Sequence, residues 1–393
     1  ELKELLEERA ATKLGDIAEN IGFASFTGLD DAFILPRSVG RTQRIAPELL
    51  RPMITGEVVR DWSITPTEVA IAPYDTRTHQ PLPLEKRASW AHFLWPYRAC
   101  AQGVASFGGK SRQEEGQNWW EWYRWQADRY SSPLRITFAF VATHNHFVLD
   151  HGGKVFNRSA PIIKLPETAT EDDHLALPAY LNSSTACFYF RQVLHSKGAQ
   201  GVNEGHKSEE WEQFLEYSGT QIATIPLPSN WHSLSTVGRL MTRLVEALDE
   251  VMPRTRVAGW SDSGRALPAD FGTTPRDRHQ RLVSIQEELD WKVYRLFGLL
   301  DDATAGTLQT VASEGFGEIA ELDRDGDAPF PGELAPGHRP FELLLDPAET
   351  QWFARNRYTT AGGVESYPEP MAALLNARMA VIRANRNLHD LVQ

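Results

Sequence analysis

One stretch of sequence decides the fold of this chain, and it reads Leu134-Arg-Ile-Thr-Phe-Ala-Phe-Val-Ala-Thr-His-Asn-His-Phe-Val-Leu-Asp-His-Gly-Gly-Lys-Val-Phe-Asn-Arg-Ser-Ala-Pro-Ile-Ile-Lys-Leu165. Its short apolar runs are rich in Val, Ile and Phe, which is typical of β-strands. The dipeptide Gly152-Gly153 interrupts the runs and tolerates the positive φ of a tight turn. The pattern predicts a rigid strand platform whose polar links present hydrogen-bonding side chains to a ligand.

Outward from this stretch, the sequence divides into a β-rich part and a helical part. Apolar residues at helical spacing from Leu2 to Ile21 predict an entry helix within residues 1–22. Short Val-, Ile-, Phe- and Trp-rich runs with Gly, Pro and Asp punctuation predict a mixed lobe over residues 23–230. Helical periodicity dominates residues 231–393. We therefore expect an α+β fold, with a β-rich lobe followed by a helical C-terminal region.

Within the lobe, the residues after Leu165 predict several smaller elements. The acidic, Pro-containing segment 166–178 is expected to be a loop. Asn182 or Ser183 is then expected to cap a helix. Residues 198–207 predict a mobile loop and residues 211–217 a short helix, before the prolines near residue 226 end the lobe.

The helical region is expected to contain three long helices, at residues 234–252, 282–300 and 371–391. Arg378, Arg383 and Arg386 are expected on the polar side of the third helix. A Gly-, Pro- and Asp-rich segment at residues 323–340 is expected to connect the last two helices.

Composition bounds the class of protein. The 393 residues are 41% hydrophobic and 23% charged, which is an ordinary globular balance, and no apolar run is long enough to span a bilayer. Cys100 and Cys187 are the only cysteines, which suits a reducing cytoplasm and excludes a disulfide scaffold or a zinc ribbon. The chain starts at Glu1 rather than Met, so we expect a piece of a longer protein.

Three further stretches, together with Leu134–Leu165, carry a resemblance to a known family. They are Arg51-Pro-Met-Ile-Thr-Gly-Glu-Val-Val-Arg-Asp-Trp62, Leu181-Asn-Ser-Ser-Thr-Ala-Cys-Phe-Tyr-Phe-Arg191 and Gln286-Glu-Glu-Leu-Asp-Trp-Lys-Val-Tyr-Arg-Leu-Phe-Gly298. The chain resembles the C-terminal part of the adenine-specific DNA methyltransferases of BREX type 2 anti-phage systems. Asn-Ser-Ser before an aromatic helix is shared widely by restriction-modification recognition domains. The strand run and the Glu-Glu-Leu-Asp-Trp stretch are more specific.

The resemblance implies the DNA target recognition part of a site-specific N6-adenine methyltransferase. Such a part reads a short asymmetric site on double-stranded DNA and presents an adenine to a catalytic lobe, where the intact enzyme uses S-adenosylmethionine. It also implies other BREX proteins, or a phage inhibitor that mimics DNA, as partners.

The methyl-transfer motifs of this class are absent from the sequence. Neither Ala72-Pro-Tyr74 nor Trp95-Pro-Tyr97 is the Asn/Asp-Pro-Pro-Tyr/Phe motif, and Ser106-Phe-Gly-Gly-Lys110 does not match the cofactor loop. We therefore expect no catalytic or cofactor-binding residue in this chain, and no methyl transfer by the chain alone.

Basic residues flank the aromatic block Trp119-Trp-Glu-Trp-Tyr-Arg-Trp125. Exposed rings and arginines of such a block stack on bases or pack against a sugar-phosphate backbone. The alternative is that Trp119, Trp122 and Trp125 form the buried face of a helix.

The polar links of the opening stretch supply the other candidates. Asn145 and Asn157 have the amide that pairs bidentately with adenine, and the neighbouring cations suit phosphates. His144 and His146 have a spacing that can hold a metal, but no Cys or carboxylate completes a set. A solvated hairpin is the alternative. The candidate DNA-binding residues are Lys110, Arg112, Arg124, His144, Asn145, His146, Lys154, Asn157, Arg158, Lys164, Arg191 and Lys197.

Other classes of function are weaker alternatives. The net charge of -12 opposes phosphate binding unless basic residues gather locally, and it favours a protein-interaction scaffold of the defence complex. A restriction-modification specificity subunit usually has two recognition lobes, whereas one is evident here. The 12 Trp suggest a carbohydrate site, but no carboxylate pair supports it. Asp323-Arg-Asp-Gly-Asp327 lacks the closing Glu of a calcium loop.

Overall fold

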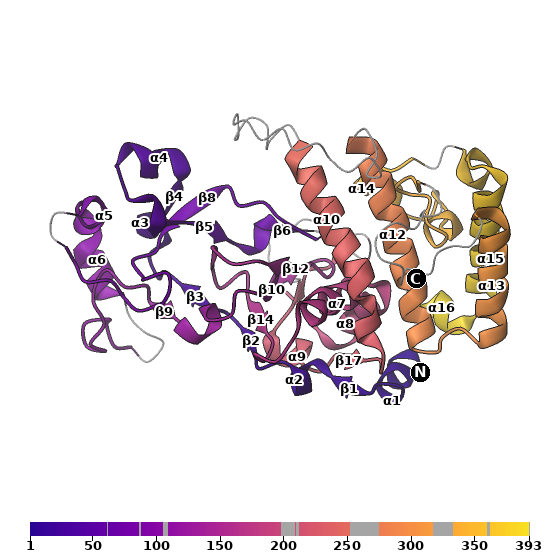
Figure 1. The fold of residues 1–393 in the computed structure, drawn as a ribbon, viewed down its shortest axis with the longest axis horizontal. Coiled ribbons are helices and arrows are strands. Elements are labelled where there is room, and N and C mark those ends of the chain that lie inside the picture. The colour runs from indigo at the N-terminus through magenta and orange to yellow at the C-terminus, as the bar shows by residue number, and fades with distance from the viewer. Residues whose placement is uncertain are drawn as a thin grey trace.

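The computed structural model describes residues 1–60, 62–85, 88–104, 109–197, 209, 212–251, 275–316, 333–359 and 362–392. Every strand among them lies before residue 228, and the residues that follow form helices and loops. The expected α+β class is therefore confirmed. Figure 1 shows the strands in one part of the molecule and the long C-terminal helices packed beside them.

The central sheet is built mainly from the stretch Leu134–Leu165, which contains three of its four strands. Its strand order is β12-β10-β14-β2, and all neighbours are antiparallel. The strands are β2 (Asn20–Gly22), β10 (Arg135–Phe138), β12 (Phe147–Asp150) and β14 (Ile162–Lys164). All residues of β10, β12 and β14 are buried, and most of them are apolar; the buried polar residues are Arg135, Thr137, Asp150 and Lys164. The predicted strand platform is confirmed.

A second sheet of four strands, in the order β13-β5-β8-β4, continues the platform. It contains β4 (Ile34–Pro36), β5 (Leu50–Ile54), β8 (Glu68–Ile71) and β13 (Val155–Phe156), which pairs in parallel with β5. Gly152 and Gly153, at φ 92° and 77°, form the predicted turn. The turn does not close a hairpin, because β12 and β13 on its two sides belong to different sheets.

Three small sheets pair short strands that are far apart in the sequence. They contain β1 (Thr12–Lys13) with β17 (Pro226–Leu227), β3 (Ser25–Phe26) with β9 (Arg124–Trp125), and β11 (Val141–Ala142) with β16 (Leu215–Glu216) and β15 (His195–Ser196). A fourth pair joins β6 (Val59–Arg60) to β7 (Ser63–Ile64). A short helix was expected at residues 211–217. This prediction is wrong, because Leu215 and Glu216 belong to strand β16. Residue 211 lies outside the described ranges. The segment 198–207 lies outside the described residues.

The helices of the first half are α1 (Leu2–Glu8), α2 (Leu14–Ile17), α3 (Asp30–Phe33), α4 (Arg37–Thr42), α5 (Ser89–Leu94), α6 (Arg98–Gly103), α7 (Glu171–Leu181), α8 (Ser184–Val193) and α9 (Gly219–Ile222). The expected entry helix is two short helices, because strand β1 separates them. The loop expected at residues 166–178 is wrong from Glu171 onward, where helix α7 begins. Thr170 and Asp173 form a capping box, and Glu171, Asp172 and Asp173 occupy the first turn of the helix, where negative charge is favourable. The Ser183 side chain caps α8 as predicted.

The helices of the second half are α10 (Ser235–Val251), α12 (Pro275–Leu296), α13 (Asp302–Phe316), α14 (Trp352–Asn356), α15 (Glu369–Ala384) and α16 (Arg386–Val392). The first predicted helix is confirmed as α10, and the second begins earlier as α12. The third is divided at Asn385, and α13 was not predicted. The segment Asp323–Asp327 lies outside the described residues.

The aromatic block is part of the core, but it is not helical. Trp119 and Trp122 are buried. Trp125 lies between Tyr74 and Tyr130, with parallel rings whose centroids are 4.0 and 4.2 Å away. The indole of Trp125 donates to the His79 carbonyl at 2.8 Å. The core interpretation of these rings therefore holds, while their predicted helical spacing is wrong.

A single cluster of buried apolar side chains extends from Leu2 to Leu391 and includes residues of both sheets and of α10 and α12. The β-rich part thus shares one core with α10 and α12, while Leu334, Met371 and Leu375 form a second, smaller cluster. Cys100 and Cys187 are both free thiols. Within the ranges that the structure describes, no helix has the length and apolar character needed to cross a membrane.

Candidate nucleic-acid interface

Arg112 is a structural residue in this fold. Its side chain is fully buried, and its guanidinium donates to the carbonyls of Thr27 and Glu121. Burial lowers the pKa of this guanidinium below its usual range. In this conformation Arg112 is not accessible to DNA, because its side chain is buried and its two terminal nitrogens donate to backbone carbonyls. Its task is to hold the aromatic block against the turn that contains Thr27.

The two candidate asparagines are also largely buried. Asn145 donates its amide to the carbonyls of Leu181 and Ser183, the latter at 3.2 Å. Asn157 accepts from the backbone N–H of Arg158 at 2.6 Å and donates to Asp30. The amide that suits an adenine edge suits a backbone turn equally well, and here both asparagines hold turns.

Five of the candidate cations and histidines are engaged by neighbouring groups. Lys164 is buried and pairs with Glu19 at 2.8 Å. Lys154 contacts Asp150 at 2.6 Å, and Lys197 contacts Glu216 at 2.5 Å. Arg191 donates to the Thr143 carbonyl at 3.2 Å. His146 is buried, with its ring centroid 4.2 Å from that of His144.

The remaining candidates reach the surface to different degrees. Arg124 is half-buried, lies over the Tyr123 ring and is 3.9 Å from Glu115. Lys110, His144 and Arg158 are exposed. The side chains of Lys110 and Arg158 have no ion-pair partner in the described part of the chain. In that part, no group of three or more His, Cys, Asp or Glu is placed to hold a metal ion.

The twelve candidates do not form one patch. In the pairing of β10 with β12, Phe138 lies opposite Phe147 and Arg135 opposite Asp150. The candidates His144 to His146 precede Phe147, whereas Lys154 contacts Asp150. These two groups therefore lie at opposite ends of a four-residue strand, roughly 10 Å apart at 3.3 Å per residue.

The four stretches that carry the family resemblance meet at one place, which we call the polar junction (Trp62, Phe147, Asn182, Ser184, Gln286 and Asp290). The side chain of Gln286 donates to the Asn182 carbonyl at 3.1 Å and accepts from the Trp62 indole at 3.2 Å. Asn182 in turn pairs with both backbone groups of Phe147, at 2.9 and 2.7 Å. Asp290 accepts from the backbone N–H of Ser184 at 2.7 Å, at the N-terminus of α8. The junction fixes the β-rich part to α12.

A buried ion network supports the junction from the helical side. Arg339 pairs with Glu287 at 2.8 Å and with Asp290. Arg378 pairs with Glu288 at 2.7 Å and is buried, so its expected position on the polar side of its helix is wrong. Burial raises the pKa of Asp290 even though Arg339 opposes this shift. This network could not be predicted from local sequence patterns, because its partners are about 50 to 90 residues apart.

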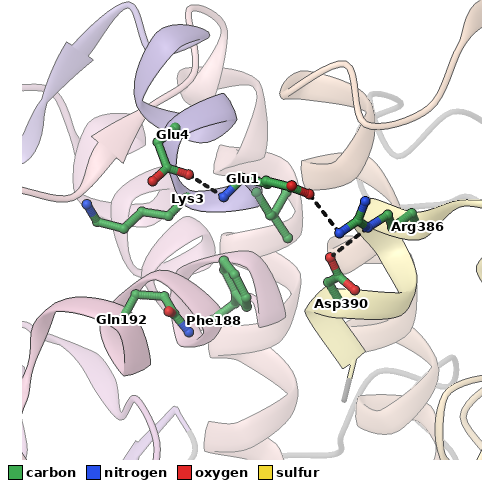
Figure 2. A pocket seen from close by; sticks show the side chains of 8 residues that line it. Glu1, Lys3, Glu4, Phe188, Gln192, Arg386 and Asp390 are labelled. Atoms are coloured by element: carbon green, nitrogen blue, oxygen red, sulfur yellow. Dashed lines mark ion pairs between the residues drawn. The ribbon is translucent and has the colours of Figure 1, made fainter.

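A cavity of about 480 Å³ lies between α1, α8 and α16, shown in Figure 2. Its rim carries charges of both signs, since Arg386 contacts Glu1 at 2.8 Å and Asp390 at 3.9 Å. No candidate DNA-binding residue lines it. A rim of paired charges without a Gly-rich turn does not fit the S-adenosylmethionine that the resemblance implies for the intact enzyme.

The sequence reasoning missed three exposed arginines, Arg37, Arg41 and Arg44, on and just after α4. None of their side chains has a hydrogen-bond or ion-pair partner in the described ranges. The signal that would have found them is their spacing of four and three residues in a segment, residues 32–47, without Asp or Glu.

The chain is similar to a known adenine-specific methyltransferase. No family model matches the chain. The chain is 32% identical over 378 residues to an adenine-specific methyltransferase. That relative is PglX of Streptomyces coelicolor, and the match covers 93% of this chain and 29% of PglX. The chain therefore spans less than a third of the length of PglX, and the resemblance seen in the sequence is confirmed.

Among solved structures, the Type IIL restriction-modification enzyme MmeI in complex with DNA is similar to this chain with a TM-score of 0.45. The sequences are 9% identical, and the match covers 75% of this chain and 34% of MmeI.

Proposed function

We propose that this chain is the DNA target recognition part of a site-specific N6-adenine DNA methyltransferase. The observation that carries the proposal is the match of 93% of the chain to part of an adenine-specific methyltransferase. The lack of both methyl-transfer motifs in this sequence supports a role in recognition rather than in chemistry. S-adenosylmethionine and the reacting adenine would bind in a catalytic lobe outside this chain.

In this proposal, residues 23–230 form the lobe that reads a short asymmetric site, residues 1–22 lead into it, and residues 231–393 brace it. A methyltransferase must take its target adenine out of the base stack, so the recognition part has to hold the duplex in one register. Exposed Lys110, His144 and Arg158 are the candidates whose positions suit such contacts best. Arg124, Arg191 and Lys197 would have to exchange their present partners for phosphates.

The proposal extends to the biological setting of the intact enzyme. The resemblance to BREX methyltransferases favours a role in phage defence in the cytoplasm. Its partners would be double-stranded DNA, the catalytic lobe and other BREX proteins, with a phage DNA mimic as an inhibitor.

The test is binding of the 393-residue chain to a pool of random duplexes at increasing salt, followed by sequencing of the retained DNA. We expect retention that falls steeply with salt and enriches one short asymmetric site, because phosphate contacts release counterions while base contacts select sequence. Retention without enrichment would remove the reading role. No retention at low salt would favour the alternative, a protein scaffold, for which the net charge of -12 is the supporting observation.

A further inference from the structure

Helix α4 and the residues just after it carry three arginines whose side chains bind no other residue in the described part of the chain. Arg37, Arg41 and Arg44 are exposed, and their guanidinium groups have no partner in the described parts of the chain. Glu68, opposite Pro36 in the sheet register, forms no ion pair with Arg37, and Asp31 and Glu48 border residues 32–47 in the sequence. In a chain of net charge -12, residues 32–47 hold three arginines and no acidic residue. Positive charge is therefore concentrated here.

Arg44 occupies a backbone conformation that favours glycine. Its φ is 54°, in the left-handed region where a Cβ crowds the following carbonyl. The N–H of Ile45 bonds to the Gly40 carbonyl and the N–H of Arg44 to the Arg41 carbonyl, which is the Schellman pattern at a helix end. Glycine is the usual residue at this position of the pattern. An arginine here is less favourable for the stability of the fold than a glycine would be.

The segment around Arg44 is firmly held. The Ser89 hydroxyl donates to the Arg44 carbonyl at 2.7 Å, which ties the end of α4 to the start of α5. On the other side, a Cβ placed on Gly40 would lie 2.6 Å from the Leu50 side chain, so α4 packs closely on β5. The arginines thus project from a rigid base beside β4, the edge strand of the second sheet. Figure 1 shows α4 far from α13 and α15, which lie at the other end of the molecule.

We propose that Arg37, Arg41 and Arg44 bind the phosphodiester backbone of duplex DNA. The proposal rests on the proposed DNA recognition function and assigns it a phosphate-binding surface. The guanidinium fork suits phosphate oxygens, and an exposed arginine without a partner among the described residues has none of them to exchange before binding. Such contacts carry no sequence information and set the position of the lobe on the duplex.

The test compares Arg44→Gly with Arg357→Gly in the 393-residue chain. Arg357 is the matched control, because it is also exposed, also has positive φ (58°) and follows α14 in the helical region. Both substitutions should raise the melting temperature by about 1–2 °C, since each relieves a left-handed arginine. Only Arg44→Gly should weaken binding to DNA, by roughly threefold or more at 0.1 M salt.

A triple variant, with Arg37, Arg41 and Arg44 all changed to Ala, extends the test. The slope of log affinity against log salt should become less steep by about 3, and equally so for two duplexes of unrelated sequence. Unchanged slopes in the triple variant, with normal binding by the wild type, would overturn this proposal and leave the DNA recognition function standing. A loss confined to one sequence would also overturn it. A wild-type chain that does not bind duplex DNA would overturn both.

Discussion

Asp150 and Arg135 are opposite one another in register and form an ion pair inside the central sheet. The carboxylate is fully buried, the Arg135 Nε is 3.3 Å away, and Lys154 contacts the other oxygen at 2.6 Å. Arg135 also lies over the rings of Tyr130 and Phe156, at 5.4 and 5.7 Å. A buried cation with one buried counter-charge depends on that partner far more than a surface pair does.

We predict that Asp150→Asn lowers the free energy of unfolding by about 3–5 kcal/mol, because it leaves Arg135 buried without a counter-charge. Urea unfolding followed by circular dichroism measures the change. The control is Glu216→Gln, which removes the exposed pair with Lys197 and should cost less than about 1 kcal/mol. Equal effects of the two variants would contradict the structural role given to Asp150.

His79 gives the fold a sensitivity to acid. Burial lowers the pKa of this imidazole, and the nearby guanidinium groups of Arg51 and Arg135 lower it further. The unfolded chain therefore takes up this proton at a higher pH than the folded chain does. We expect the contribution of His79 to be complete above about pH 6.5 and to be lost as the pH falls through its lower folded pKa.

The variant His79→Asn tests this expectation, since Asn tolerates the positive φ of 56° at this position and does not titrate. Between pH 7.5 and pH 5.5 the wild type should lose more stability than the variant does. Parallel pH profiles for the two proteins would show that His79 is not the responsible group.

At the scale of elements, Asn182 supplies hydrogen bonds to the edge strand β12 that a neighbouring strand would otherwise supply. Strand β12 is at the edge of the central sheet, and the Asn182 amide bonds to both backbone groups of Phe147. The residue belongs to the turn between α7 and α8, so it joins the helices to the sheet as well.

We predict that Asn182→Ala destabilises the fold by about 1–3 kcal/mol, since two backbone groups of Phe147 lose their partner. Native-state hydrogen exchange should show the Phe147 amide among the most affected. Asn118→Ala is the matched control, because Asn118 is exposed and bonds only within its own turn, to Glu121. If Asn118→Ala lowers the free energy of unfolding by more than about 0.5 kcal/mol, the effect of Asn182→Ala is not specific to its bonds with Phe147.

Some of these elements could be predicted from the sequence and others could not. The long periodic helices α10 and α12 and the cap at Ser183 were predictable, because their signals are local. Strands of two residues, such as β9 and β16, show no periodicity and were not found. Polar residue types in the links were predictable, but not their burial: the carbonyls that hold Asn145 come from residues 36 and 38 positions away. Exposure without a partner, which singles out Arg44, is visible only in three dimensions.

At the scale of the whole molecule, one large apolar core joins the lobe to α10 and α12, and Leu334, Met371 and Leu375 form a second, smaller cluster at α15. Side chains such as Ile285, Leu289 and Val293 of α12 belong to the same buried cluster as residues of the central sheet. The polar junction and the ion network around Arg339 lie along this contact.

We predict that the chain unfolds in one cooperative transition. Tryptophan fluorescence, to which residues 23–230 contribute eight of the 12 tryptophans, and far-ultraviolet circular dichroism, which is weighted to the helices, should give the same midpoint in urea. Two separated midpoints would show that the lobe and the helices are independent folding units, contrary to the shared core.

The stack of Tyr74, Trp125 and Tyr130 also has an optical consequence. Three chromophores at 4.0 and 4.2 Å, with interplanar angles of 7° and 8°, are close enough for their electronic transitions to couple. Such coupling in a rigid, chiral setting gives intense near-ultraviolet dichroic bands, and exposed tryptophans do not. The stack belongs entirely to the β-rich lobe, so those bands report on the order of the core of that lobe without any added label.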